Sequence, residues 1–330
     1  MELLRHLNEL ARPGPAREKT VLTIGVFDGV HIAHRSLIAG AVMSAREQGA
    51  QSVVLSFDPH PDTVVKRNPP PMIYLTDLED KARLIAEIGV DKLIIQPFTP
   101  EFGRITATDF VDRLLQLLNL REIQVGEDFV FGYKAQGNVE WLRQVGYAKG
   151  FQVKALAPLE VDQEIVSSTH IRDLLGSGRV DKAARLLGRP YSLKGMVIHG
   201  NQRGRLIGFP TANMAIPASF SVPGNGVYAT MTTIYGLASE NKSESEDADK
   251  NLPQPSVTNV GVRPTFDNGE RSVETFILDY SGDLYDRIIR VEFIQKLRDE
   301  RKFSGIDEIR TQLGHDVEEA RQALALAGRA

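Results

Sequence analysis

The chain contains no cysteine among its 330 residues. This absence excludes disulfides, a thiolate nucleophile, and zinc or iron–sulfur sites with cysteine ligands, and it is compatible with a reducing compartment. The sequence also lacks an apolar run of the roughly 18 residues that a membrane span requires. Residues 1–20 have no uninterrupted apolar stretch after a basic patch, so we expect no signal peptide there. Together these absences predict a cytoplasmic protein.

An excess of positive charge is also missing. The formal net charge is -4, which argues against a general nucleic-acid binder. The phosphate-binding pattern GxGxxG is absent, and the stretch 132–137 has the outer glycine spacing of a P-loop but is followed by Asn138. A dinucleotide dehydrogenase and a P-loop ATPase are therefore disfavoured. We expect small-molecule partners, no nucleic acid and no membrane, and a weak homo-oligomer is left open.

One stretch near the start, residues 21–38, organises the rest of the chain. A short apolar run at 21–24 predicts a buried strand, a turn follows, and an apolar helical pattern begins at Leu37. His31 and His34 fall at the start of that helix, three residues apart, and so share one face. A helix N-terminus offers unpaired N–H groups and positive dipole charge, so the stretch predicts a phosphate site.

The pattern up to about residue 156 alternates continuously apolar strands with helices, which is typical of a parallel sheet covered on both faces. In such sheets ligands bind beyond the carboxyl ends of the strands. His31 and His34 follow the first strand, His60 follows the second, and a glycine-rich loop follows the fourth. The expected strands are 21–24, 52–57, 92–96, 122–125 and 151–156, and the expected helices begin after His34 and span 78–88, 108–118 and 138–148.

The pattern changes after Pro190 to short β-type runs separated by Gly, Pro and Asn, which predicts an antiparallel sheet or small barrel. These runs are 192–198, 226–234, 256–260, 273–280 and 288–294, followed by a helix over about 305–327. Two short helices, 170–175 and 180–187, precede them. We therefore predict domains at 1–187 and 188–330. Residues 238–255 are acidic and serine-rich, and predict a mobile loop inside the second domain.

Three segments of the first domain resemble the nucleotidylyltransferase superfamily. Residues 25–34, GVFDGVHIAH, resemble its phosphate site in the GxFDGxHxGH version, with Ala33 where that family usually has Gly. Residues 166–172, VSSTHIR, resemble its second signature, and residues 126–138 resemble a loop of the FAD synthetase branch. The resemblance implies that His31, His34 and Arg172 hold phosphates during catalysis. It implies ATP binding by Gly25, Phe27, Asp28, Asn138, Ser167, Ser168 and Thr169. Asp58, His60 and Phe129 are expected to contact the flavin.

The second domain carries a different signature at 200–213, GNQRGRLIGFPTAN. Its glycines allow the backbone to close over a polyphosphate, and Thr and Asn are hard oxygen ligands suited to Mg²⁺. With residues 259–265, 273–279 and 297–303, this set resembles riboflavin kinase. The resemblance implies that Thr211 and Asn213 bind Mg²⁺, that Glu274 is the catalytic base, and that Arg298 holds the flavin. Phe276 stands where the family usually has His. The implied ATP contacts are Gly200, Gly204, Gly208 and Pro210.

Taken together, the segments resemble the bifunctional riboflavin kinase/FMN adenylyltransferases, the prokaryotic FAD synthetase family, over about residues 20–325. The resemblance implies an α/β plus β architecture: a Rossmann-like parallel-sheet domain and then an antiparallel β-barrel with a terminal helix. The implied reactions convert riboflavin to FMN and FMN to FAD, with ATP as co-substrate and Mg²⁺ as cofactor. Two alternatives stay open. One is a riboflavin kinase whose adenylylation is impaired by Ala33, and the other is a flavin-binding module without turnover.

Overall fold

The computed structural model describes residues 1–10, 18–66, 71–200, 208–237, 252–262 and 271–328. The chain divides into two compact units, Met1–Ser168 and Thr169–Ala330. Gly204, part of the predicted loop at 238–255, and residues 263–265 of the kinase-like signature lie outside the described residues.

A six-stranded parallel sheet forms the first unit, in the order β1-β4-β3-β2-β5-β8. Strand β2 lies in the middle, with β3 on one side and β5 on the other. The chain therefore reverses its direction of winding at the carboxyl end of β2, where ligands bind in such sheets. The strands are β1 (Glu2–Leu4), β2 (Lys19–Ile24), β3 (Gln51–Asp58), β4 (Lys92–Pro97), β5 (Asn119–Gly126) and β8 (Gln152–Leu156).

The sequence prediction of five parallel strands is confirmed, and residues 1–20 contribute a sixth strand that was not predicted. Strand β1 pairs in parallel with β4, with Leu3 opposite Leu93. Three residues are too few to show a hydrophobic period, so pairing with a neighbouring strand decides their structure.

Helices cover both faces of this sheet because alternate side chains of each strand point to opposite sides. On one face, Ile38 of α1 (Ile32–Glu47) and Ile85 of α3 (Leu78–Ala86) share a core with Val54. On the other, Leu114 of α4 (Ala107–Leu117) and Leu142 of α5 (Val139–Lys149) pack with residues of the same strands. The smaller elements are η1 (Leu7–Leu10), η2 (Asp28–Val30), α2 (Asp62–Val65), η3 (Phe102–Arg104), β6 (Val130–Phe131), η4 (Tyr133–Ala135), β7 (Gly137–Asn138), β9 (Glu160–Val161) and β10 (Glu164–Ile165).

A buried polar cluster, here called the Glu122 cluster, fixes α1 to the sheet. Its carboxylate on β5 is 1% exposed and accepts hydrogen bonds from Ser44 Oγ and Gln48 Nε2, each at 3.0 Å. Gln124 Nε2 donates at 2.6 Å, and Lys154 Nζ lies 3.1 Å away. Four partners satisfy this buried charge, as burial requires.

The second unit contains a closed antiparallel barrel in the order β11-β12-β15-β14-β13-β16, which confirms the predicted barrel. Its interior is partly polar, because the hydroxyl of Thr230 hydrogen-bonds those of Ser256 and Thr258, each at 2.8 Å. The strands are β11 (Tyr191–Ile198), β12 (Ala212–Ala215), β13 (Gly226–Leu237), β14 (Gln254–Val262), β15 (Arg271–Ile277) and β16 (Arg287–Arg298). Strand β12 was not predicted, since the segment was interpreted only as a ligand-binding signature.

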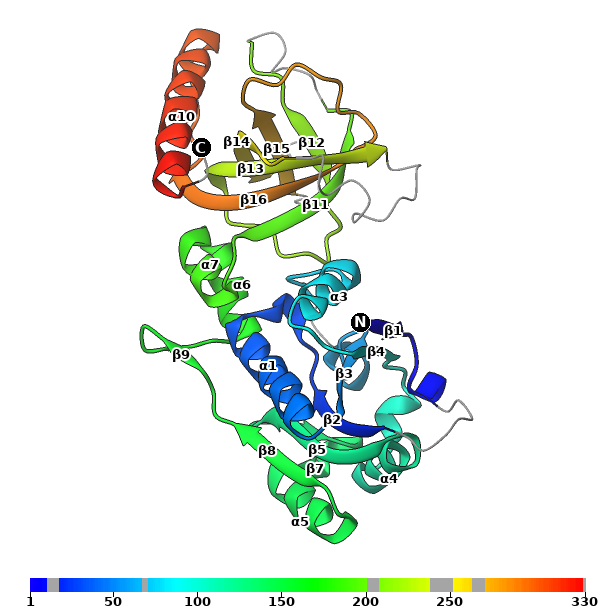
Figure 1. The fold of residues 1–330 in the computed structure, drawn as a ribbon. Coiled ribbons are helices and arrows are strands. Elements are labelled where there is room, and N and C mark those ends of the chain that lie inside the picture. Colours follow the sequence, from blue (N-terminus) through cyan, green and yellow to red (C-terminus); the bar gives the residue numbers. More distant parts are fainter. Residues whose placement is uncertain (11–17, 67–70, 201–207, 238–251, 263–270, 329–330) are drawn as a thin grey trace. The chain divides into compact units, whose positions relative to one another are not determined.

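Within the part of the chain that the structure describes, three helices accompany the barrel: α6 (Ser168–Gly176), α7 (Val180–Leu187) and α10 (Ile306–Leu326). Helix α10 runs beside the barrel and buries Ala320 and Leu324 against it (Figure 1). Helix α7 contacts β11 and β16, so by its contacts it belongs with the barrel. The domain boundary at 187/188 stays a prediction. Among the helices of the described residues, none combines the length and apolar character needed to cross a membrane.

Candidate active sites in the two units

The turn after β2 carries the first site. Phe27 and Val30 adopt left-handed backbone conformations, with φ of 53° and 40°, although neither is glycine. Such conformations are strained and persist only where the surroundings hold them. Both side chains are fully buried, and a Cβ at Gly25 would meet the Phe27 ring at 2.8 Å. Packing therefore fixes the shape of this turn and requires glycine at position 25.

The two predicted histidines lie together where α1 begins. His31 is the N-cap residue, and its Nδ1 accepts a hydrogen bond from the backbone N–H of His34 at 3.3 Å. The two rings stack with centroids 3.5 Å apart. Burial lowers the pKa of His34 well below its usual value, and the nearby His31 and Lys81 lower it further. His34 is therefore neutral at pH 7, and among the described residues its shielded Nδ1 has no hydrogen-bond partner.

Ala33, which departs from the family pattern, lies in the first turn of α1 with a backbone that is not left-handed. Position 33 therefore needs none of the conformational freedom of glycine. A methyl group there is compatible with the helix and with the stacked histidines on either side of it in the sequence.

Asp28 and Ser168 hold the turn from inside. The Asp28 carboxylate is 2% exposed and accepts the backbone N–H of Leu75, with 3.0 and 3.1 Å to its two oxygens. It also accepts from the N–H of Thr76 at 3.3 Å. Ser168 Oγ donates to the carbonyl of Asp28 at 2.9 Å, which brings the start of the second signature to the first. The role predicted for Asp28 in ATP binding stays a prediction.

An open cavity of about 740 Å³ lies at the carboxyl edge of this sheet. It brings together three predicted residues, Gly25, His60 and Phe129. Aromatic rings from β3, η3, α4, β6 and the loops between them surround these residues, and the Phe129 and Phe131 rings stack with centroids 5.3 Å apart. An aromatic cavity of this kind suits a planar apolar ligand. Five further phenylalanines line the cavity and were not predicted, although one of them follows β4 directly: Phe57, Phe98, Phe102, Phe110 and Phe131.

Several other predicted residues of the first signature lie elsewhere or stay unplaced. Asn138 caps α5, since its side chain accepts the backbone N–H of Trp141 at 2.8 Å. Asp58 ends β3, and it is not among the residues that line the described cavity. Ser167 immediately precedes α6. Thr169 and Arg172 belong to the second unit, so their place beside the histidines stays a prediction.

Lys81 is a residue of this site that the sequence reasoning missed. It is 2% exposed on α3, and its Nζ donates to the carbonyl of Val26 at 2.9 Å. The available signal was its spacing, because Lys81 falls between Leu78 and Ile85 on the apolar stripe of the helix. A charged residue on an apolar stripe is a candidate for a buried function.

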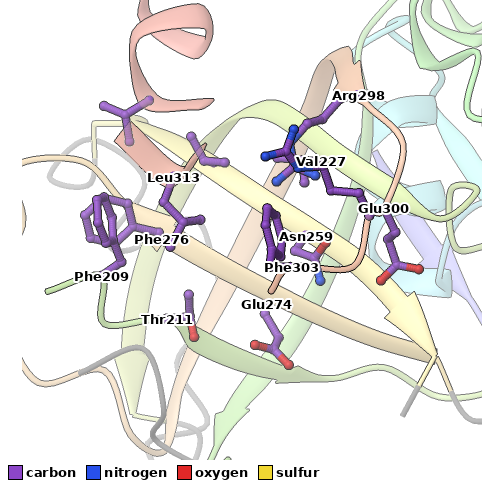
Figure 2. A pocket seen from close by; sticks show the side chains of 13 residues that line it. Phe209, Thr211, Val227, Asn259, Glu274, Phe276, Arg298, Glu300, Phe303 and Leu313 are labelled. Carbon is purple, nitrogen blue, oxygen red and sulfur yellow. The ribbon is translucent and has the colours of Figure 1, made fainter. Parts of the chain in front are cut away.

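The second site lies on the outer face of the barrel, in a cavity of about 290 Å³. Strand register places Glu274 of β15 opposite Asn213 of β12 and Asn259 of β14. Figure 2 shows Glu274 and Thr211 beside each other at one end of the cavity, with Phe209 and Phe276 forming an apolar wall. Those two rings meet edge to face at 5.3 Å. The cavity therefore joins a carboxylate and oxygen donors to an aromatic surface.

Thr211 lies between this cavity and a smaller cleft. The cleft has a volume of about 70 Å³ and is lined by Thr211, Pro210 and Tyr285, among others. Asn213 lies close to Gly200, because a Cβ at that glycine would meet the amide of Asn213 at 2.3 Å. Gly208 has a left-handed φ of 86°, which glycine adopts without strain. Two predicted ATP contacts therefore lie near the oxygen donors: Gly200 lies beside Asn213, and Pro210 lines the cleft with Thr211. Gly208 precedes Thr211 by three residues in the sequence.

Arg298 lines the same cavity from the end of β16. Its Nε and Nη2 each lie 2.7 Å from an oxygen of the Asp316 carboxylate on α10, which is fully buried. Its Nη1 donates to the carbonyl of Asp299. The guanidinium is therefore fixed by the terminal helix, and its predicted contact with the flavin stays a prediction.

Comparison with known proteins agrees with this division into two sites. Residues 14–170 match the family model described as FAD synthetase, and residues 187–324 match that described as riboflavin kinase. The bifunctional riboflavin kinase/FMN adenylyltransferase of Bacillus subtilis is 36% identical over 307 residues, 92% of each chain. The protein of the same name from Escherichia coli K12 is 35% identical over 99% of each chain.

One solved structure is also similar over almost the whole chain. It is a Streptococcus pneumoniae protein described as a macrolide-efflux protein, with a TM-score of 0.84 and 29% identity, covering 97% of this chain and 99% of that one. The two family models match consecutive parts of the chain, and the bifunctional relatives are similar over nearly all of it. The chain belongs to the bifunctional riboflavin kinase/FMN adenylyltransferase family.

Proposed function

We propose that this chain makes FAD from riboflavin in two ATP-dependent steps. The second unit transfers the γ-phosphoryl group of ATP to the 5′-hydroxyl of riboflavin and yields FMN and ADP. The first unit transfers the adenylyl group of a second ATP to FMN and yields FAD and pyrophosphate. The observation that carries the proposal is the pair of separate cavities, one in each unit, each built around the signature of one activity.

Glu274 is the base of the kinase step. Its carboxylate accepts the proton of the riboflavin 5′-hydroxyl while the oxygen bonds to the γ-phosphorus of ATP and ADP leaves. The half-buried side chain of Glu274 stands at the end of the cavity, and the wall of Phe209 and Phe276 offers an apolar surface for the flavin ring (Figure 2). The expected pose places the ring on this wall and the ribityl chain towards Glu274.

The donors around Glu274 fit a magnesium ion. Thr211 and Asn213 supply a hydroxyl and an amide oxygen, and Mg²⁺ prefers such hard oxygen ligands together with phosphates of the substrate. Strand register places Asn213 opposite Glu274, and Gly200 has no side chain that would collide with the Asn213 amide. Bound there, Mg²⁺ would offset negative charge on the phosphates of ATP.

In the first unit, the protein positions two phosphates rather than forming a covalent intermediate. A phosphate oxygen of FMN attacks the α-phosphorus of ATP, and the bond to the pyrophosphate leaving group breaks. The N-terminus of α1, His31 and His34 hold the phosphates and stabilise the charge that develops, and the phosphate contact implied for Arg172 stays a prediction. Neutral His34 can donate one hydrogen bond through a ring N–H. The FMN ring fills the aromatic cavity beside His60 and Phe129.

These roles also define the working boundary and setting of the enzyme. We assign adenylylation to residues 1–187 and phosphorylation to residues 188–330. The partners are small molecules that occur in the cytoplasm, so that is where we place the reaction. Ala33 does not favour the loss of adenylylation, because its helical backbone makes no demand for glycine.

The test is a time course with purified protein, riboflavin, ATP and Mg²⁺, in which the flavins are separated by chromatography. FMN should accumulate first and FAD later. FMN without FAD would leave a kinase alone and overturn the adenylylation step. Neither product, with riboflavin bound in the absence of ATP and Mg²⁺, would support a flavin-binding module instead.

Two variants separate the sites. Glu274→Gln should abolish FMN formation from riboflavin but still convert supplied FMN to FAD, whereas the exposed Glu319→Gln should change neither activity. His31→Ala should show the opposite pattern, with FMN formation kept and FAD formation lost. A parallel loss of both activities in either site variant would contradict the assignment of one reaction to each unit.

A further inference from the structure

Lys81 presents an unusual chemical situation in the first unit. Its side chain is almost fully buried, although lysine is rarely buried without partners. Its ammonium group has three N–H donors, and within the described parts of the chain only the carbonyl of Val26 accepts one of them. A buried charge that is incompletely satisfied is costly and calls for a functional explanation.

The Val26 carbonyl that accepts from Lys81 belongs to the strained turn. Val26 immediately precedes Phe27, whose backbone is left-handed, and its carbonyl also accepts a hydrogen bond from Ser56 Oγ at 2.9 Å. The stretch just before α3 holds the same turn, because Thr76 Oγ1 accepts from the N–H of Gly29 at 3.1 Å. Lys81 therefore completes a clamp on the backbone that leads into the phosphate site.

Charged and titratable groups face Lys81 from several elements. Burial lowers its pKa, while Asp28 in the turn and Asp58 at the end of β3 raise it, and the net shift is downward. The positive charge of Lys81 in turn contributes to the lowered pKa of His34, after burial and His31. Electrostatic interactions are strong in such a poorly solvated environment. Lys81 thus influences both the shape of the turn and the potential at the start of α1.

We propose that Lys81 is a positioning residue for adenylyl transfer. Its ammonium holds the Val26 carbonyl, keeps the turn of residues 25–31 in the shape that receives ATP, and adds positive charge beside the triphosphate. This inference rests on the adenylylation proposed above for the first unit. It assigns no bond-making step to Lys81, and the lysine acts through the turn and through His34.

The first test compares Lys81→Met, which keeps most of the side-chain volume but removes the charge, with the exposed Lys149→Met as a control on the same unit. In the Lys81 variant the KM for ATP in FAD formation should rise by about tenfold, because the charge-assisted hydrogen bond to the Val26 carbonyl is lost. Phosphorylation of riboflavin in the second unit should not change. The Lys149 variant should retain both activities.

The pH profile separates an electrostatic role from a purely structural one. Loss of the Lys81 charge raises the pKa of His34, with His31, Asp28 and Asp58 still facing the site. The acid limb of FAD formation should therefore move to higher pH in Lys81→Met. An unchanged profile together with an ATP KM within about twofold of wild type would overturn the proposal.

The absence of cysteine allows the ammonium to be restored at this position alone. Lys81→Cys is unfolded, alkylated with 2-bromoethylamine and refolded, which creates a lysine analogue, and wild type undergoes the same treatment. The fluorescence of Trp141, the single tryptophan, reports whether the first unit is native. Recovery of the ATP KM and the pH profile supports the proposal. If the alkylated variant is native but recovers neither the ATP KM nor the pH profile, the proposal is overturned. If wild type forms no FAD, the adenylylation itself is overturned.

Discussion

The ion pair between Arg298 and Asp316 offers a sharp test of how the second unit is held together. Asp316 lies on α10 with its side chain fully buried, and the Arg298 side chain is 19% exposed. Gln312 Nε2 also donates to the carboxylate at 2.8 Å. Asp316→Asn keeps the shape of the side chain but removes its charge and turns one acceptor into a donor that faces the guanidinium.

The magnitude follows from burial. Breaking one partner of a fully buried pair costs about 3–5 kcal/mol, because the remaining charge is left uncompensated. Arg298 retains some access to water and its bond to the Asp299 carbonyl, so we expect about 2–3 kcal/mol for Asp316→Asn. For a unit of this size, that loss lowers Tm by about 5–10 °C.

Two optical probes distinguish the units in urea unfolding. The fluorescence of Trp141 reports the first unit, where its ring contacts Phe131 with centroids 5.7 Å apart. Far-UV circular dichroism reports both units. Asp316→Asn should shift the circular dichroism transition of the second unit to lower urea and leave the Trp141 fluorescence transition unchanged. The exposed Glu319→Gln should shift neither transition.

The same variant should weaken the kinase step through KM for riboflavin, because Arg298 lines that cavity. Conversion of supplied FMN to FAD should persist. A change in stability of less than about 0.5 kcal/mol would refute the reasoning, since it would mean that the pair makes no net contribution.

Three further predictions concern the rest of the fold. Ala33→Gly should cost up to about 1 kcal/mol of stability in the Trp141 transition and leave FAD formation within about twofold of wild type; a large gain in activity would show that the methyl obstructs ATP. Burial alone would raise the pKa of Glu122, but the hydrogen bonds and charge of its cluster outweigh burial and lower the pKa. The carboxylate therefore stabilises the first unit above the unfolded pKa of about 4.3, and this stabilisation is lost as the pH falls through the folded pKa. Glu122→Gln should therefore destabilise the first unit at pH 7 and flatten its acid dependence, and an unaltered urea midpoint across pH 3–7 (about the range of carboxylate titration) would count against this. Leu186→Ala should cost about 2–4 kcal/mol in the second unit, and a shift confined to Trp141 fluorescence would contradict the packing of α7 with the barrel.

The parallel sheet and the barrel were both predictable, because long apolar runs and turn residues carry strong periodic signals. The short strands β1 and β12 were not, since three or four residues show no period and their structure depends on pairing with β4, β11 and β15. The same reasoning explains why the signature around Thr211 was interpreted through chemistry alone and not as the start of a strand.

Candidate site residues show a similar division. The sequence singled out His31, His34 and Glu274 from spacing and resemblance, and the structure places the histidines in contact and Glu274 in a cavity. It also singled out Asn138, whose side chain caps a helix. A side chain that binds a backbone N–H and one that binds a ligand have the same residue type, so sequence alone does not separate them.

The sequence by itself determined the fold classes, their order, and the two signatures, because periodicity and glycine-rich turns are local properties of the chain. The tertiary structure alone decided what surrounds each charge. It buried Lys81 against the carbonyl of Val26, joined Arg298 to Asp316, and enclosed Glu122 among four partners. Apart from Gln124, which lies on the same strand as Glu122, these partners are separated by 18 to 78 residues along the chain, so that only folding brings them together. The energy of a buried charge depends on those distant neighbours and not on the residues beside it in the sequence.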